Sequence, residues 1–81
     1  MSDIGEIEFV IKSIISNVLE ISSDEINDFS SPRSIKGWVG VNHRNIIFEL
    51  ENAFNITFDQ SELDTLVNYK IIKATILAHV G

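Results

Sequence analysis

Residues 35–66 read IKGWVGVNHRNIIFELENAFNITFDQSELDTL, and the spacing of apolar side chains in this stretch predicts two helices. Five apolar residues of its first part fall mostly at helical intervals, and they are Val41, Ile46, Ile47, Leu50 and Phe54. Intervals of three and four place side chains on one face of an α-helix, whereas a half-buried strand needs alternation. The pattern predicts a helix that ends at Asn55. Asp59 and Glu62 then have the spacing of a capping box, which predicts a short helix after it.

The segment before this stretch carries the longest helical pattern of the chain. Apolar residues recur there at the same period, and they are Ile7, Val10, Ile11, Ile14, Ile15 and Val18. Asp3 and Glu6 have the spacing of a capping box, so we expect a helix from about Asp3 to Leu19. Ser22 and Glu25 form another such pair, which predicts a short turn that presents the apolar residues following it.

The remaining segments complete an all-α pattern. Residues 30–37, SSPRSIKG, contain the only proline and are predicted to be a loop. Asn68 offers a cap for a final helix, whose pattern is Ile71, Ile72, Thr75, Ile76 and Val80. We therefore expect one all-α domain over residues 1–81, a four-helix bundle with three main helices and one short helix. Its predicted core includes Ile11, Ile14, Val18, Ile47, Leu50, Phe54, Leu63 and Ile76.

Composition excludes several classes of function. Twelve acidic residues against six basic ones give a net charge of −6, so the chain lacks the basic footprint that nucleic acids require. It has no cysteine, and neither His43 nor His79 has an acidic residue at ligand spacing, so we expect no metal site. The longest apolar run has three residues, which predicts no membrane insertion. No signal peptide opens the sequence, so we expect a cytoplasmic protein.

Several positions of residues 35–66 match a known family when they are taken together. In chain order they are Ile35, Gly37-Trp38, Leu50-Glu51, Phe54 and Ile56, followed by the acidic segment DQSELDTL. In the order and spacing of these positions, nearly the whole chain resembles the acyl carrier protein family. The resemblance implies an acyl-carrier-protein-like four-helix bundle. It also implies a second helix that begins with Asp-Ser-Leu, whose serine oxygen carries phosphopantetheine.

At that attachment motif the chain departs from the family. Aligned without gaps, Val39, Gly40 and Val41 stand where the family has Asp-Ser-Leu. A phosphodiester needs an oxygen nucleophile and glycine has no side chain, so Gly40 cannot carry the group and we expect no cofactor. Phosphopantetheine would be present only if another hydroxyl were used, and the candidates are Ser30, Ser31, Ser34 and Thr57. By the family analogy the modifying transferase recognises a serine at the helix start, so the three loop serines are interpreted as turn residues.

The loss of the aspartate also affects the expected start of the second helix. Val39 cannot cap a helix as an aspartate does, and the loss of a cap costs about 0.5–2 kcal/mol. Asn42 is the next residue that can cap. We therefore expect regular helix to begin between Val41 and His43, with Val39 and Gly40 frayed or in a turn.

Most of the acidic face that the family presents on this helix is absent as well. The positions concerned are Val39, Asn42, Asn45 and Asn52, and Arg44 stands where the family usually has an apolar residue. The leading hypothesis is a domain that carries no prosthetic group and binds proteins of fatty-acid, polyketide or peptide synthesis, either synthase-type enzymes or another carrier. We expect a monomer whose partner-binding residues are Val39, Val41, Arg44 and Phe48. In the alternative interpretation the two valines complete the core and Arg44 is merely solvated.

Two further hypotheses remain open at the level of sequence. One is a working acyl carrier protein that is modified at an unusual serine. The other is a non-covalent binder that houses an acyl chain between its helices. We expect no enzymatic activity, because no acid–base pair, nucleophile–base pair or phosphate-binding glycine loop can be assembled from these residues.

Overall fold

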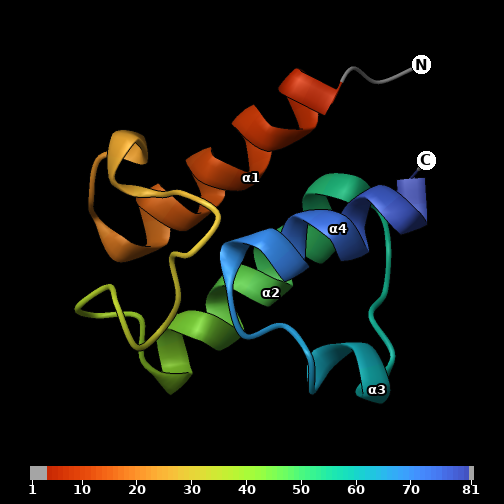
Figure 1. The fold of residues 1–81 in the computed structure, drawn as a ribbon. Helices are drawn as coiled ribbons and strands as arrows, with labels where there is room; N and C mark the ends of the chain where they lie inside the picture. Colours follow the sequence, from red (N-terminus) through yellow and green to blue (C-terminus); the bar gives the residue numbers. More distant parts are fainter. Residues whose placement is uncertain (1–3, 81) are drawn as a thin grey trace.

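The computed structural model describes residues 4–80, which form four α-helices joined by loops (Figure 1). The helices are α1 (Ile4–Leu19), α2 (Gly40–Phe54), α3 (Gln60–Leu63) and α4 (Tyr69–Val80), and a short 3-10 helix, η1 (Ser23–Glu25), follows α1. No strand occurs among the described residues. The Cα radius of gyration is 11.6 Å, close to the value of about 12 Å expected for a compact chain of this length. The prediction of an all-α domain with three main helices and one short helix is confirmed.

The core lies between the three longer helices, with α1 in contact with both α2 and α4. Every fourth residue of α1 is buried, and these residues are Ile7, Ile11, Ile15 and Leu19. This interval keeps side chains on one face of a helix, as the sequence pattern predicts. Helices α2 and α4 supply the facing side chains, which are Ile46, Ile47, Leu50, Tyr69, Ile72 and Ile76.

The predicted core is right in part. Four of its residues are buried, namely Ile11, Ile47, Leu50 and Ile76, whereas Ile14, Val18, Phe54 and Leu63 are partly buried and pack against the core from its edge. The apolar stripe of each helix is wider than the seam where two helices meet, so residues at its margin keep some contact with solvent. Four other core residues, Ile26, Trp38, Phe58 and Leu66, lie in loops, where a helical period carries no information.

Three of the predicted caps are present. In α3, Asp59 and Glu62 each accept a hydrogen bond from the other's backbone N–H, and in η1 Ser22 and Glu25 do the same. The Oδ1 atom of Asn68 accepts the backbone N–H of residue 71 at 2.9 Å and so caps α4. The fourth predicted cap, which involves residue 3, lies outside the described residues.

The segment between η1 and α2 is tied to the rest of the fold. The Tyr69 N–H donates to the Ser30 carbonyl oxygen at 2.8 Å. The Lys73 Nζ lies 3.2 Å from the Asp28 Oδ1 and 3.4 Å from the Glu8 Oε1, so one ammonium group links α1, this segment and α4. Next to these bonds, Phe29 is 85% exposed. The turn that follows η1 therefore presents an aromatic ring to solvent rather than to the core.

The arrangement of the helices places the start of α2 at one end of the molecule. In Figure 1 residues 20–39, coloured orange to yellow-green, lie at the end opposite the start of α1 and the end of α4. None of the helices formed by residues 4–80 is long and apolar enough to cross a membrane.

Candidate functional site

Helix α2 begins at Gly40, so the expectation that it begins between Val41 and His43 is wrong. Val39 occupies the N-cap position with extended backbone angles, and its side chain forms no capping hydrogen bond. The first helical hydrogen bond runs from the His43 N–H to the Val39 carbonyl oxygen at 2.8 Å. The helix therefore starts at the residue that the resemblance aligns with the family's serine, and no side chain caps it.

Contacts from the preceding loop hold the first turn of α2 in place, although they cap none of its backbone N–H groups. Trp38 is only 1% exposed, and its indole Nε1–H donates to the His43 Nδ1 at 2.9 Å, across the first turn of α2. The Asn42 side chain does not cap the helix but donates to the Gly37 carbonyl oxygen at 2.7 Å. Gly37 has φ +91°, a conformation that favours glycine and turns the chain into the helix. The buried Trp38 thus joins the preceding loop to the first turn of α2, a tertiary contact that local capping patterns do not predict.

Open space surrounds Gly40. A Cβ atom added there meets no other atom within 4 Å, and the residue is exposed. The position that the resemblance assigns to the modified serine is thus free of steric obstruction but has no oxygen.

The alternative hydroxyls lie elsewhere and form hydrogen bonds of their own. The Ser30 Oγ is buried and accepts the N–H of residue 27 at 2.8 Å. The Ser31 Oγ accepts the N–H of residue 33 at 3.2 Å, and the Ser34 Oγ accepts the Ser31 N–H at 3.0 Å. These are the bonds of turn residues, as the sequence predicts. Thr57 is exposed but lies beyond the far end of α2.

The four residues predicted to bind a partner are all exposed. Val39 is 58%, Val41 62% and Phe48 60% exposed, and Arg44 is also in the exposed class. The alternative interpretation, in which the two valines complete the core, is therefore wrong. Residues 41, 44 and 48 are three and four positions apart, so they follow one another along a single face of α2. We call Val39, Val41, Arg44 and Phe48 the α2 face.

Two hollows border the α2 face on the side of α3. The smaller, of about 330 Å³, is lined by Gly40, His43, Arg44, Ile47 and Leu63. The larger, of about 650 Å³, is lined by Phe29, Ser31, Pro32, Arg33, His43, Leu63, Leu66, Val67 and Asn68. Both contain His43 and Leu63, so they adjoin one another, and we call them together the flanking groove. Arg44 belongs both to the groove and to the α2 face, so the groove and the face form one continuous surface.

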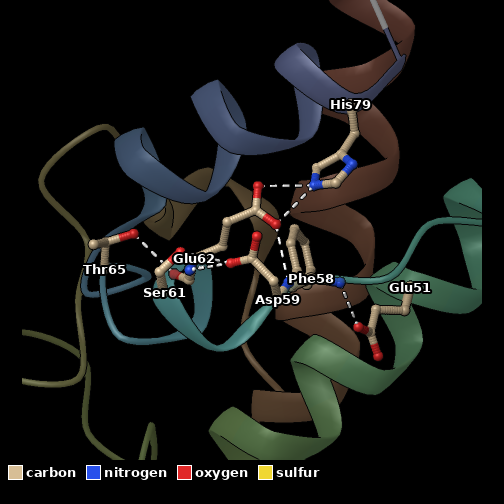
Figure 2. Close-up of polar contacts among 7 residues, drawn as sticks. All are labelled: Glu51, Phe58, Asp59, Ser61, Glu62, Thr65 and His79. Carbon is tan, nitrogen blue, oxygen red and sulfur yellow. Dashed lines mark hydrogen bonds and ion pairs between the residues drawn. The ribbon is translucent and has the colours of Figure 1, made fainter.

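A polar cluster holds α3 against α4 and so fixes one wall of the groove (Figure 2). The His79 Nε2 lies 2.8 Å and 3.0 Å from the two carboxylate oxygens of Glu62. The same carboxylate accepts the Asp59 N–H at 3.0 Å. A hydrogen bond of 2.7 Å from the Ser61 hydroxyl lowers the pKa of Asp59. The sequence predicts the cap within α3 but not the contact of Glu62 with His79, because 17 positions separate these two residues.

Burial lowers the pKa of His43 from its ordinary value of 6.5. Because its Nδ1 accepts the Trp38 indole N–H, the ring is neutral with its proton on Nε2. Protonation would place a second N–H against the indole N–H and remove the acceptor. The unfolded chain therefore takes up a proton at His43 at a higher pH than the folded chain does.

That difference predicts a loss of stability in acid. As the pH falls below 6.5, the unfolded state binds more protons at His43 than the folded state, so the free energy of unfolding should decrease until the folded His43 is itself protonated. Urea unfolding at a series of pH values from about 8 to about 5 measures the effect. His43→Gln, which keeps an acceptor but does not titrate, is the matched control. An identical pH dependence in both proteins would contradict the prediction.

The uncapped start of α2 gives a second prediction. Val39→Asp should raise the free energy of unfolding by about 1 kcal/mol, because a carboxylate at an extended N-cap accepts the free N–H groups of the first turn and favours the helix dipole. Val39→Ala supplies the control for the loss of the valine side chain. Urea midpoints that coincide for the aspartate and alanine variants would show that the first turn gains nothing from a cap.

Comparison with known proteins adds no family assignment. No protein-family model matches this chain, and no curated protein matches it either. Within the described part of the chain, no three His, Cys, Asp or Glu residues gather closely enough to hold a metal ion. The candidate functional site is therefore defined by its own geometry, as an exposed apolar helix face beside an open position and a groove.

Proposed function

We propose that the chain is an acyl-carrier-protein-like domain that lacks the phosphopantetheine-bearing serine and acts as a protein-interaction module related to fatty-acid, polyketide or peptide synthesis. The observation that carries this proposal is the start of α2. Gly40 stands in the first turn of the helix, in open space, between two exposed valines. A helix start with room for a side chain supports the likeness to an attachment site, while Gly40 offers no nucleophile and two exposed valines flank it.

The exposure of the α2 face supports the interaction role. Val41 and Phe48 together leave two large apolar side chains in water on one helix face, and a third, Val39, precedes them. Contiguous exposed apolar residues with a polar rim mark sites of protein interaction. Partners of the proposed kind are synthase-type enzymes or another carrier protein.

The proposal is tested by one mass measurement. After incubation with coenzyme A and a broad-specificity phosphopantetheinyl transferase, the wild-type protein should show no gain in intact mass. A serine-bearing carrier protein, treated in the same tube, should gain the mass of the phosphopantetheine group and so confirms that the enzyme is active. A gain by the wild-type chain would overturn the proposal, and peptide mapping would then identify the serine of a working carrier.

The flanking groove favours a second candidate function, the non-covalent binding of an acyl chain. Its apolar walls include Leu63, Leu66 and Val67, and the Arg33 side chain at its lining offers a partner for a carboxylate. Native mass spectrometry with palmitate tests this function. A one-to-one complex that is lost in Leu63→Glu, provided that this variant keeps its helical circular dichroism, would support acyl-chain binding.

A further inference from the structure

The charges of the chain are segregated along the sequence. Residues 29–48 contain three basic residues, Arg33, Lys36 and Arg44, and no acidic residue. All twelve acidic residues lie outside this segment. The protein as a whole is strongly acidic, but the segment that contains the α2 face is basic.

The same segment carries much of the exposed apolar surface. Among the large hydrophobic residues exposed in the described part of the chain, Phe29, Val39, Val41 and Phe48 belong to it. All three basic residues of the segment are exposed as well. Arg33 and Arg44 line the two parts of the flanking groove, which meet at His43, so these two charges border one continuous surface.

Two carboxylates of α2 lie close in sequence to the α2 face, but both are directed elsewhere. Glu51 on α2 accepts the backbone N–H of Phe58 at 2.8 Å, as Figure 2 shows. Glu49 follows Phe48 directly, but one residue corresponds to a rotation of about 100° around the helix axis, which turns it away from the face. The α2 face is therefore a local basic and apolar patch on an acidic molecule, whereas the α3 wall of the groove carries Glu62 and Asp64 on either side of Leu63.

We propose that the α2 face docks an acidic protein surface, most simply an amphipathic helix with carboxylates beside its apolar stripe. This inference rests on the proposed function as an interaction module and names the chemistry of the partner. Apolar side chains of the partner would cover Val41 and Phe48, while its carboxylates would face Arg33, Lys36 and Arg44. Charge complementarity of this kind sets orientation and partner choice, because like charges are excluded. The charge of the α2 face is thus positive, whereas the resemblance would imply a negatively charged face.

Two other partners for the α2 face, a second copy of the chain and an anionic membrane, fit the observations less well. In a symmetric dimer the same patch meets itself, which would bring the three cations against their copies. Contact between the patch and the acidic remainder of a second copy would be head-to-tail, and such contacts form open chains rather than closed dimers. An anionic membrane would attract the three cations, but the twelve carboxylates of the same small molecule would oppose its approach.

Two synthetic helical peptides test the inference. Both carry leucines at the same positions of one face, and the flanking positions are glutamate in one peptide and lysine in the other. Fluorescence anisotropy measures their binding, and amide chemical shifts locate it. We expect the glutamate peptide to bind wild-type protein, the lysine peptide not to bind, and the largest shifts to fall on residues 39–48. Binding should weaken as salt screens the charges.

Charge reversal provides the matched controls. Arg44→Glu should weaken binding of the glutamate peptide by about tenfold, because an attraction becomes a repulsion of similar size. Lys70→Glu changes the net charge equally, but Lys70 lies at the start of α4, outside residues 29–48, so its effect should stay below about twofold. Circular dichroism shows whether both variants keep the fold. Equal effects of the two reversals, equal binding of the two peptides, shifts outside the patch, or no binding of either peptide would each overturn the inference.

Two parallel measurements exclude the other occupants. When vesicles made from phosphatidylglycerol and phosphatidylcholine are sedimented, the protein should stay in the supernatant. If it co-sediments with the vesicles and Arg44→Glu abolishes this, the patch binds a membrane and the inference of a protein partner is wrong. Analytical ultracentrifugation should show a monomer. If the protein self-associates and Arg44→Glu abolishes this, the partner is a second copy of the chain and the inference is wrong.

The inference and the proposed function are contradicted by different results. A gain of phosphopantetheine by the wild type refutes only the absence of carrier chemistry, whereas the peptide results concern only the partner.

Discussion

Trp38→Ala should remove a large part of the stability of this domain. Trp38 is almost fully buried and its indole N–H is bonded to His43 in the first turn of α2. Truncation of a buried tryptophan to alanine costs about 3–5 kcal/mol, because the lost contacts leave a cavity. A domain of 81 residues has a total stability of only about 4–12 kcal/mol. Urea unfolding followed by far-UV circular dichroism measures the change.

Two further variants separate the packing of Trp38 from its hydrogen bond. Trp38→Phe keeps a large ring but loses the N–H donor, so its cost should be smaller, about 1–3 kcal/mol. Phe29→Ala removes an aromatic ring that is exposed, and its midpoint should stay within about 0.5 kcal/mol of the wild type. If Trp38→Ala unfolded at the same urea concentration as Phe29→Ala, Trp38 would have no part in the core.

Trp38 is a core residue that no pattern in the sequence identifies. The helical periods of residues 4–19, 40–54 and 69–80 are visible in the chain, because a helix buries one face and repeats its apolar residues accordingly. Trp38 lies in a loop, so no period identifies it as a core residue. Its contact with His43 joins that loop to the first turn of α2, and the helix begins earlier than a rule based on capping residues predicts.

The candidate site was predictable to a different extent. The absence of a nucleophile at Gly40 follows from the letters of the sequence, and so does the concentration of basic residues in positions 29–48. The exposure of Val39 and Val41 does not follow, because an apolar side chain next to a helix start can point either way. The groove could not be predicted either, since His43 and Leu63 come from helices that only the tertiary fold brings together.

The largest expected change in chemistry comes from restoring the attachment motif. Val39→Asp, Gly40→Ser and Val41→Leu, combined in one protein, should make the chain a substrate for a phosphopantetheinyl transferase, whereas the wild type gains no mass. The structure favours this outcome, because α2 already begins at Gly40 and a side chain added there meets nothing within 4 Å. An aspartate at the extended residue 39 can cap the helix. Because Val41 is exposed, a leucine there would contact the transferase rather than fill the core.

Comparison with two related variants makes that result specific. Gly40→Ser alone supplies the hydroxyl without the cap or the negative charge, so it should be modified more slowly than the triple variant. Val39→Asp, Gly40→Ala and Val41→Leu together restore everything except the oxygen, so this protein should gain no mass under any condition. If the triple variant folds and still remains unmodified, the charge of the helix face is the next cause to test, because Arg44 would still confront a transferase that reads acidic groups. Arg44→Glu is then added to the triple variant, and modification should follow. A folded protein that carries all four substitutions and still gains no mass would contradict the proposal that the carrier framework is intact.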